Sequence, residues 1–271
     1  MIPSSPARLI DTHAHLQESD LRSDLNAVLK RAKLAGISQI VAIGTTAVDS
    51  AEVVEIASGF SGIFAAVGVQ PNNVSEAKAS DWERIVSLAG LGRVVAIGET
   101  GLDRYWDRVP FEDQQAWFDR HLTLAHERDL PVVIHCRDCE RDIVSQLSTL
   151  NRPIRGVLHS FTGNWDDAEA FLALGLYLSF AGMVTFANKK LDVLREVAER
   201  MPLNRLLLET DSPYLSPHPY RGKRNEPARV LFTAGKIAEI RRISLAELAL
   251  ATTANACELF QLPEGDTLEV G

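Results

Sequence analysis

The segment PVVIHCRD, residues 131–138, shows the pattern that decides the fold, which is a short apolar run followed at once by a histidine. Similar runs recur along the chain, each with a histidine or an acidic residue at or just past its end. They are RLIDTHAHL (8–16), VVAIGET (94–100), GVLHSF (156–161) and LLLETD (206–211). Strands that all end in such residues are typical of a parallel barrel with its chemistry gathered at one rim.

Eight strand-like runs can be found, at a spacing near thirty residues, with helical stretches between most of them. The strands are expected at 8–13, 37–43, 63–69, 94–98, 131–134, 156–158, 177–180 and 206–208. The helices are expected at 23–35, 50–58, 81–89, 111–128, 142–150, 166–174, 191–201, 230–240 and 245–260. This alternation, over 271 residues, predicts an α/β fold, a (β/α)8 TIM barrel that forms a single domain, residues 1–271.

Composition limits the possible function classes. Hydrophobic residues make up 46% of the chain and charged residues 24%, which fits a soluble globular protein with a real core. The net charge of −8 argues against a broad surface for nucleic acid, although a small basic patch beside a metal site is compatible with it. No apolar run is long enough to span a bilayer, and the opening MIPSSPAR lacks the features of a secretory signal, so we expect a cytoplasmic protein.

Six side chains at the strand ends are candidate metal ligands. They are His13, His15, Glu99, His135, His159 and Asp211. Side chains alternate along a strand, so the H-x-H pair would aim two imidazoles at one point. Four imidazoles and two carboxylates suit one or two divalent metals, and a surface histidine pair or a salt bridge at the barrel mouth are the ordinary alternatives.

Other chemistry-bearing residues have simpler interpretations. Cys136 and Cys139 form a C-x-x-C spacing, but without a second cysteine pair we interpret them as ordinary thiols. His121 and His126 lie five apart on an expected helix and therefore on different faces, so we interpret both as surface or interlayer residues.

With these residues in place, the chain resembles the TatD family of metal-dependent hydrolases over nearly its whole length. The motifs are DTHAHL (11–16), GETGLD (98–103), PVVIHCRD (131–138), LHSFTG (158–163), LLLETDSPYL (206–215), RGKRNEP (221–227) and ANACELF (254–260). The resemblance implies a TIM barrel that binds two divalent cations, and several members are deoxyribonucleases. It also implies the ligand roles: His13 and His15 hold one cation with Asp211 beside it, and Glu99 bridges to a second one completed by His135 and His159.

One segment departs from the family pattern. Many members carry a His-Pro-His-like sequence after the third strand, whereas this chain has Gln70 and Asn72 there. Neither is a candidate ligand, so metal binding should be unaffected. A glutamine forms hydrogen bonds but does not exchange protons near neutral pH, so rate or specificity should differ if the histidine of other members takes part.

The leading functional hypothesis is a divalent-metal-dependent deoxyribonuclease that hydrolyses phosphodiester bonds of DNA with a metal-activated water. Asp211 and Glu99 are the catalytic candidates, Asp211 as the proton acceptor and Glu99 between the cations, which are zinc, magnesium or manganese. Glu209 is assigned only a possible role beside the ligands. Substrate contacts are expected from Arg137, Arg221, Lys223, Arg224 and Gln70.

Two alternatives remain open. The same barrel and ligands could hydrolyse a small phosphoester, a lactone or a cyclic amide, since fold does not fix substrate. A closed apolar pocket would favour such a small molecule, and a basic groove would favour nucleic acid. The other alternative is a scaffold with a purely structural metal, although such sites are normally closed by four ligands. The sequence indicates no membrane association and no obligate protein partner.

Overall fold

The computed structural model describes residues 8–263 and 265–270, and within them one sheet of eight parallel strands follows the chain order from β1 to β8. The strands are β1 (Leu9–Ala14), β2 (Ile37–Ile43), β3 (Ile63–Val67), β4 (Val94–Asp103), β5 (Val132–Arg137), β6 (Gly156–Leu158), β7 (Tyr177–Phe180) and β8 (Leu206–Leu208). The sheet curls into a nearly closed TIM barrel, so the prediction of the fold is confirmed.

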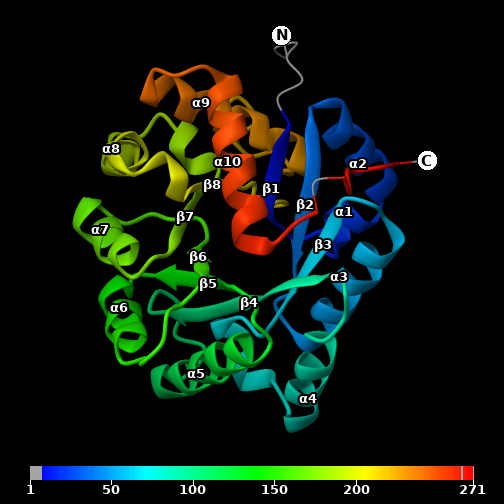
Figure 1. Ribbon diagram of the computed structural model, residues 1–271, viewed down its shortest axis with the longest axis vertical. Coiled ribbons are helices and arrows are strands. Elements are labelled where there is room, and N and C mark those ends of the chain that lie inside the picture. Colours follow the sequence, from blue (N-terminus) through cyan, green and yellow to red (C-terminus); the bar gives the residue numbers. More distant parts are fainter. Residues whose placement is uncertain (1–7, 264, 271) are drawn as a thin grey trace.

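Helices surround the barrel (Figure 1). They are α1 (Ser19–Arg22), α2 (Leu25–Leu34), α3 (Ala47–Gly59), α4 (Ala79–Leu88), α5 (Phe111–Glu127), α6 (Glu140–Ser148), α7 (Trp165–Ala173), α8 (Asp192–Arg200), α9 (Val230–Arg241) and α10 (Leu245–Phe260). Short 3-10 turns complete them: η1 (Pro71–Glu76), η2 (Gly182–Thr185), η3 (Lys189–Leu191), η4 (Leu203–Arg205) and η5 (Pro227–Arg229). Among the described residues, none of the helices combines the length and the apolar content that crossing a bilayer requires.

The strands form where the chain is almost continuously apolar, because both faces of a parallel strand in a barrel are covered. All residues of β3 and β7 are buried, for example. Several helices begin at a residue whose side chain accepts a hydrogen bond from a free backbone N–H of the first turn. Thr46 accepts from the N–H of Asp49 at the start of α3, and Ser244 accepts from Glu247 at the start of α10.

Two strands run further than the sequence predicts, and both extensions carry candidate ligands. We expected β4 to end at Gly98 and β5 at Ile134, whereas they reach Asp103 and Arg137. The two strands pair again beyond a register shift, and the glycines of β4 permit this close approach. A side chain at Gly101, which has a φ of 133°, would overlap the carbonyl oxygen of His135.

The barrel is closed between β8 and β1 by the segment that follows β8 rather than by a regular ladder. The N–H of Asp211 donates to the carbonyl of His13 over 2.9 Å, and the N–H of His15 donates to that of Ser212 over 2.8 Å. The buried carboxylate of Asp11 accepts hydrogen bonds from the backbone and hydroxyl of Thr210 across the same gap. We call this closure the seam, residues 11–15 with 210–212.

The end of the barrel that faces away from the candidate ligands is closed by α10. Leu259 and Phe260 of this helix pack against inward-facing apolar residues near the start of the strands, including Ile10 and Phe64. Figure 1 shows α10, in red, lying across the middle of the barrel in that view. One end of the barrel is therefore an apolar floor, and the ends of the strands are left for polar residues.

Some predictions concern residues that the structure does not describe, and one predicted helix has different bounds. Residues 1–7, 264 and 271 lie outside the described residues, so the reading of the opening segment and of one domain over residues 1–271 stay predictions. The first helix was expected at 23–35, whereas α2 spans Leu25–Leu34 and a separate short helix, α1, precedes it, with Ser23 and Asp24 between the two.

His121 is the one buried histidine of α5, and it fits the interlayer interpretation, whereas His126 is exposed. Its Nε2 accepts a hydrogen bond from the N–H of Val69 over 3.0 Å, and its Nδ1 donates to the carbonyl of Trp117 over 2.7 Å. Burial lowers the pKa of His121 to about 4, since a charged imidazolium could neither be hydrated there nor accept from Val69.

This pKa predicts a pH-dependent contribution to stability. Between about pH 6.5 and pH 4 the unfolded chain takes up a proton at His121 that the folded chain does not. The free energy of unfolding should therefore decrease as the pH is lowered through this window, by about 3 kcal/mol over the whole window. In urea unfolding, His121→Gln should be less stable than the wild type at pH 7, and the gap should narrow towards pH 4.5. His126→Gln is the matched control on the same helix, and parallel curves for wild type and His121→Gln would contradict this assignment.

Candidate metal centre

All six candidate ligands lie at one end of the barrel. His13 is in β1, Glu99 in β4 and His135 in β5, and His15, His159 and Asp211 follow the ends of β1, β6 and β8. Glu99 lies midway along β4, and the other five lie near or just past the carboxyl ends of their strands, which meet at one rim in a parallel barrel. Residues up to 198 positions apart in sequence (13 and 211) are therefore brought together.

The first group of ligand atoms comprises His13 Nε2, His15 Nε2, Glu99 Oε2 and Asp211 Oδ1. The two imidazole nitrogens are 3.2 Å apart, and Asp211 Oδ1 lies 3.6 Å from His13 Nε2 and 3.3 Å from His15 Nε2. Glu99 Oε2 lies 3.6 Å and 3.9 Å from the same nitrogens. Both carboxylate oxygens thus lie within 3.9 Å of both imidazole nitrogens.

The second group of ligand atoms uses the other oxygen of Glu99. Its Oε1 lies 2.9 Å from His135 Nδ1 and 3.2 Å from His159 Nε2, and the two nitrogens are 3.3 Å apart. Tetrahedral bonds of about 2.0–2.1 Å place ligand atoms about 3.3–3.4 Å apart. The spacings of the first group, 3.2–3.9 Å, bracket that separation, and those of the second group, 2.9–3.3 Å, lie at or just below it, so each group could hold a divalent ion with little rearrangement.

Neighbouring acceptors fix which ring nitrogen of two histidines faces the group. His15 Nδ1 donates to the carbonyl of Ile43 over 3.0 Å, which leaves Nε2 directed at Glu99 and Asp211. His135 Nε2 donates to Asp103 Oδ2 over 2.9 Å, which leaves Nδ1 directed at Glu99. Such outer hydrogen bonds are the usual way in which metal-binding histidines are oriented.

The electrostatics of the centre favour a negatively charged Glu99. Burial raises the pKa of Glu99, but the charge of His159 and hydrogen bonds from His13 and His135 outweigh it and hold this pKa well below its usual range. Burial likewise lowers the pKa of His15, and the hydrogen bond and charge of Asp211 overcome it and raise this pKa to about 9. The carboxylates are thus balanced by imidazolium charge, a role that a bound cation can fill instead.

Asp211 has the same balance of causes. Burial raises the pKa of Asp211, but the hydrogen bond from His15 and the charge of His13 lower it overall. Its backbone adopts a left-handed conformation, with a φ of 54°, which is uncommon outside glycine and concentrates at functional sites. The seam holds it there, because its own N–H is bonded to His13.

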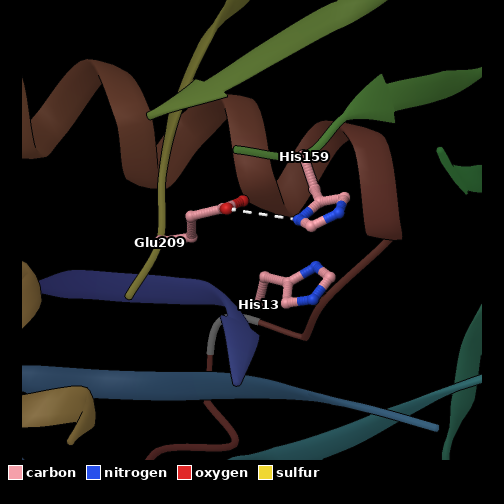
Figure 2. Close-up of side chains that lie close together, drawn as sticks. All are labelled: His13, His159 and Glu209. Carbon is pink, nitrogen blue, oxygen red and sulfur yellow. Dashed lines mark ion pairs between the residues drawn. The ribbon is translucent and has the colours of Figure 1, made fainter. Parts of the chain in front are cut away.

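Glu209 lies behind the second group. Figure 2 shows its carboxylate pointing at His159, whose ring lies parallel to that of His13. Glu209 Oε1 is 3.5 Å from His159 Nδ1 and accepts a hydrogen bond from the N–H of Ser160. Ligand atoms of His13, His159 and Glu209 also come close enough together to hold an ion. A simpler role for Glu209 is to orient His159 from its far side, as carboxylates beside metal-bound histidines do.

A polar cavity of about 550 Å³ opens over the two groups. Its lining contains the candidate ligands His15, Glu99, His135, His159 and Asp211, together with Gln70. The other lining residues are Glu18, Thr45, Asn72, Asn73, Trp106, Arg108 and Tyr214. No lining residue is aliphatic, which differs from the mostly apolar pockets that enclose small ligands.

The expected substrate contacts are distributed unevenly around this cavity. Gln70 lines it and caps η1, where its side chain accepts from the N–H of Asn72. Arg137, Arg221, Lys223 and Arg224 are exposed but are not among the lining residues. Arg224 is bound to Asp24 over 2.8 Å, and the guanidinium of Arg221 lies 3.6 Å from the ring centre of Phe186. These residues stay predictions as substrate contacts.

Asp103, Trp106 and Arg108 were missed by the sequence analysis. Asp103 was legible only as the last letter of GETGLD, because nothing local indicates that β4 continues through Gly101 to reach it. Trp106 and Arg108 lie in an exposed loop, where no periodic pattern exists to mark them. The signal available was their position shortly after a ligand-bearing strand.

The thiols fit the plainer interpretation. The sulfur atoms of Cys136 and Cys139 are 3.8 Å apart. The hydrogen bond with Cys139 and burial raise the pKa of Cys136, which keeps the thiol protonated and a poor metal ligand. Within residues 8–263 and 265–270, no cysteine belongs to a group that could hold an ion.

Comparison with known proteins places this geometry in a family. A family model described as TatD related DNase matches residues 10–261. The chain belongs to the TatD family. It is 40% identical over 255 residues to the uncharacterised metal-dependent hydrolase YabD of Bacillus subtilis, covering 94% of this chain and 99% of that one. It is therefore a member of a family of metal-dependent hydrolases.

Two further relatives bear on fold and activity. The crystal structure of YjjV, a TatD homologue from Escherichia coli, superposes with a TM-score of 0.91 at 32% identity, covering 96% of this chain and all of that one. A protein of Pantoea vagans named 3'-5' ssDNA/RNA exonuclease TatD is 36% identical, covering 94% of this chain and all of that protein. The nuclease activity in that name is said of the relative alone.

Proposed function

We propose that this TatD family member is a divalent-metal-dependent deoxyribonuclease that hydrolyses phosphodiester bonds. The observation that carries the proposal is the position of Glu99, whose two carboxylate oxygens face two separate groups of ligand atoms. A carboxylate shared in this way suits two ions a few ångströms apart, as in many enzymes that cleave phosphate esters. The name of the Pantoea vagans relative agrees with a nucleic-acid substrate.

The proposed centre contains two divalent cations. His13, His15 and Asp211 would hold one, His135 and His159 the other, and Glu99 would bridge them. The donors are imidazole nitrogens and carboxylate oxygens, which accept zinc, manganese or magnesium. The group of Glu99, His135 and His159 supplies three donors, which would leave a position open for water or substrate, unlike a structural site closed by four ligands. This donor set supports an enzyme over a structural metal.

When bound, divalent cations polarise a phosphoryl oxygen and make water a better nucleophile at neutral pH. The chain itself supplies the proton acceptor. Asp211 lines the cavity, and hydrogen bonds keep it ionised in spite of its burial. We propose that Asp211 takes the proton of the attacking water as its oxygen bonds to phosphorus and the P–O bond to the leaving sugar oxygen breaks, with that oxygen protonated from solvent. We propose that Glu99 keeps the two groups of ligands aligned.

Contacts with the substrate chain are proposed from exposed cations around the rim. Arg137, Arg221, Lys223 and Arg224 can bind phosphates, and Gln70 can donate or accept a hydrogen bond inside the cavity. The polar lining of the cavity supports a nucleic-acid substrate over a small apolar lactone or cyclic amide. A cytoplasmic location stays part of the proposal on sequence grounds only.

Removing metal ions tests the proposal directly. Chelator-treated protein should lose hydrolysis of single-stranded DNA, and magnesium, manganese or zinc should restore it, because the converging ligand atoms suit divalent ions and the polarisation of the phosphoryl oxygen would be lost with them. The screen should include double-stranded DNA, RNA, a small phosphodiester and a lactone. Full activity of rigorously metal-free protein would overturn the metal dependence, and activity confined to the lactone would overturn the nuclease.

A further inference from the structure

The loop between β4 and α5 displays two large aromatic rings beside the cavity. Tyr105 is 53% exposed and Trp106 is 43% exposed, although rings of this size are usually well buried. Trp106 lines the cavity over the ligand groups, and so does Arg108, which follows it two residues later. Exposed tyrosine and tryptophan are typical of binding surfaces, where their flat faces give large contact area.

Two rings lie between two cations along this edge of the cavity. The guanidinium carbon of Arg137 lies 3.9 Å from the centre of the Tyr105 ring, and the Tyr105 and Trp106 ring centres are 4.9 Å apart. The guanidinium carbon of Arg108 then lies 4.7 Å from the centre of Trp106. We call these four residues the aromatic–basic track. It leads from the cavity, at Trp106 and Arg108, outward to Tyr105 and Arg137.

The two cations of the track, Arg108 and Arg137, have no carboxylate partner among the described residues. Over the part of the chain that the structure describes, neither Arg108 nor Arg137 forms an ion pair. Other arginines nearby differ, since Arg104 is bound to Asp142 and Arg224 to Asp24. A guanidinium that is held over a ring but unpaired keeps its N–H groups available for phosphate oxygens.

A third exposed ring faces the cavity from the other side of the rim. Tyr214 is 52% exposed, lines the cavity and has its ring centre 6.0 Å from that of His15. It follows β8, whereas Trp106 follows β4, and these strands are opposite one another in a barrel of eight strands in chain order. The ligand groups thus lie between two aromatic residues.

We propose that the aromatic–basic track binds the nucleotides next to the scissile phosphate, with Trp106 stacked on a base and Arg108 and Arg137 on the adjoining phosphates. This inference rests on the proposed nuclease function. It places the bound nucleic-acid strand along the loop between β4 and α5. Proteins hold single strands by combining aromatic rings with cations, because every base offers a flat face and every linkage a charge. The faces of bases inside a duplex are covered by stacking, so only an unpaired nucleotide can use Trp106.

The test compares chains that carry bases with chains that do not. Metal-loaded wild type and Trp106→Ala would be assayed on hexathymidylate and on the same hexamer with abasic sugars throughout. Binding would be followed by fluorescence anisotropy on labelled phosphorothioate versions. Loss of the stack should weaken binding and raise KM for hexathymidylate roughly ten-fold or more, with little change on the abasic chain. Trp106→Phe should recover most of the loss.

Arg108→Ala should behave differently, because a phosphate contact does not depend on the base. Binding of both hexamers should weaken, and the slope of affinity against salt should fall by about one counterion. The matched control is Arg120→Ala, since Arg120 also lies over a tryptophan, Trp82, at 4.5 Å, but on the outer helices α4 and α5. This variant should change the binding of neither hexamer. The metal content of every variant should equal that of wild type.

The outcomes separate this inference from the function on which it rests. Wild type that neither binds nor cleaves any chain would overturn both. Wild type that cleaves hexathymidylate, with Trp106→Ala and Arg108→Ala indistinguishable from it in KM and binding, would overturn the track and leave the nuclease standing. If binding weakens in the double variant Arg221→Ala/Lys223→Ala but in none of the track variants, the nucleic-acid strand follows the loop after β8 instead. That result would also overturn the track.

Discussion

Replacing Asp211 with asparagine is expected to lower turnover on a phosphodiester by roughly a hundred-fold or more, which corresponds to about 2.7 kcal/mol of transition-state stabilisation. Asparagine keeps the shape and one carbonyl oxygen but neither the charge nor the ability to take a proton. Substrate affinity should change much less. The barrel core is untouched, and four histidines and Glu99 remain to bind metal, so the variant should fold.

Kinetics and metal analysis of the same preparation decide what Asp211 does. Asp142→Asn is the control, because it changes an acidic residue that binds Arg104 at the surface, away from the ligand groups. A variant at position 211 with normal metal content and normal turnover would remove Asp211 from the mechanism. Loss of metal together with activity would identify Asp211 as a ligand and leave its role as the proton acceptor without support.

Glu99→Gln should have the largest effect of any single substitution, a loss of roughly a thousand-fold or more in activity, since several kcal/mol of metal-derived stabilisation would go. Glutamine fits the space, but it carries no charge and its nitrogen cannot act as a ligand. Because both oxygens of Glu99 face ligand groups, affinity for both ions should fall together. Elemental analysis after dialysis, followed by calorimetric titration with manganese, measures this.

Glu209→Gln provides the matched comparison, since it is also buried and acidic but lies beyond His159. If Glu209 only orients His159, metal affinity should fall about ten- to a hundred-fold rather than vanish. Equal losses in the two variants would mean that Glu209 is itself a ligand. Two ions retained by Glu99→Gln would exclude the bridge.

The sequence predicted the barrel well because each strand can be recognised from its own residues. Runs such as ISQIVAI, residues 37–43, are largely apolar, and a buried parallel strand has no other requirement. The same regularity made the strand ends recognisable, and His13, Glu99 and His135 are found together at the rim. Their roles as ligands stay predictions, although their convergence could be inferred from strand order alone.

What the sequence could not provide depends on contacts between distant segments. Arg224 appeared to be a free cation of the RGKR loop, yet its partner Asp24 lies 200 residues earlier in the chain. Asp103 supports His135 only because β4 resumes its pairing with β5 after an irregularity. Trp106 and Arg108 acquire meaning from the cavity beside them, and a loop residue has no period by which to foresee it.

The seam links the closure of this barrel to the proposed metal centre. Three candidate ligands, His13, His15 and Asp211, belong to the two segments whose backbones join β1 to the end of β8. An ion held by these three would work as a clasp, because it binds the closed barrel and not the open one, and its affinity adds directly to the stability of the closed form. Loss of the ion and loosening of the first and last strands would then be two views of one equilibrium.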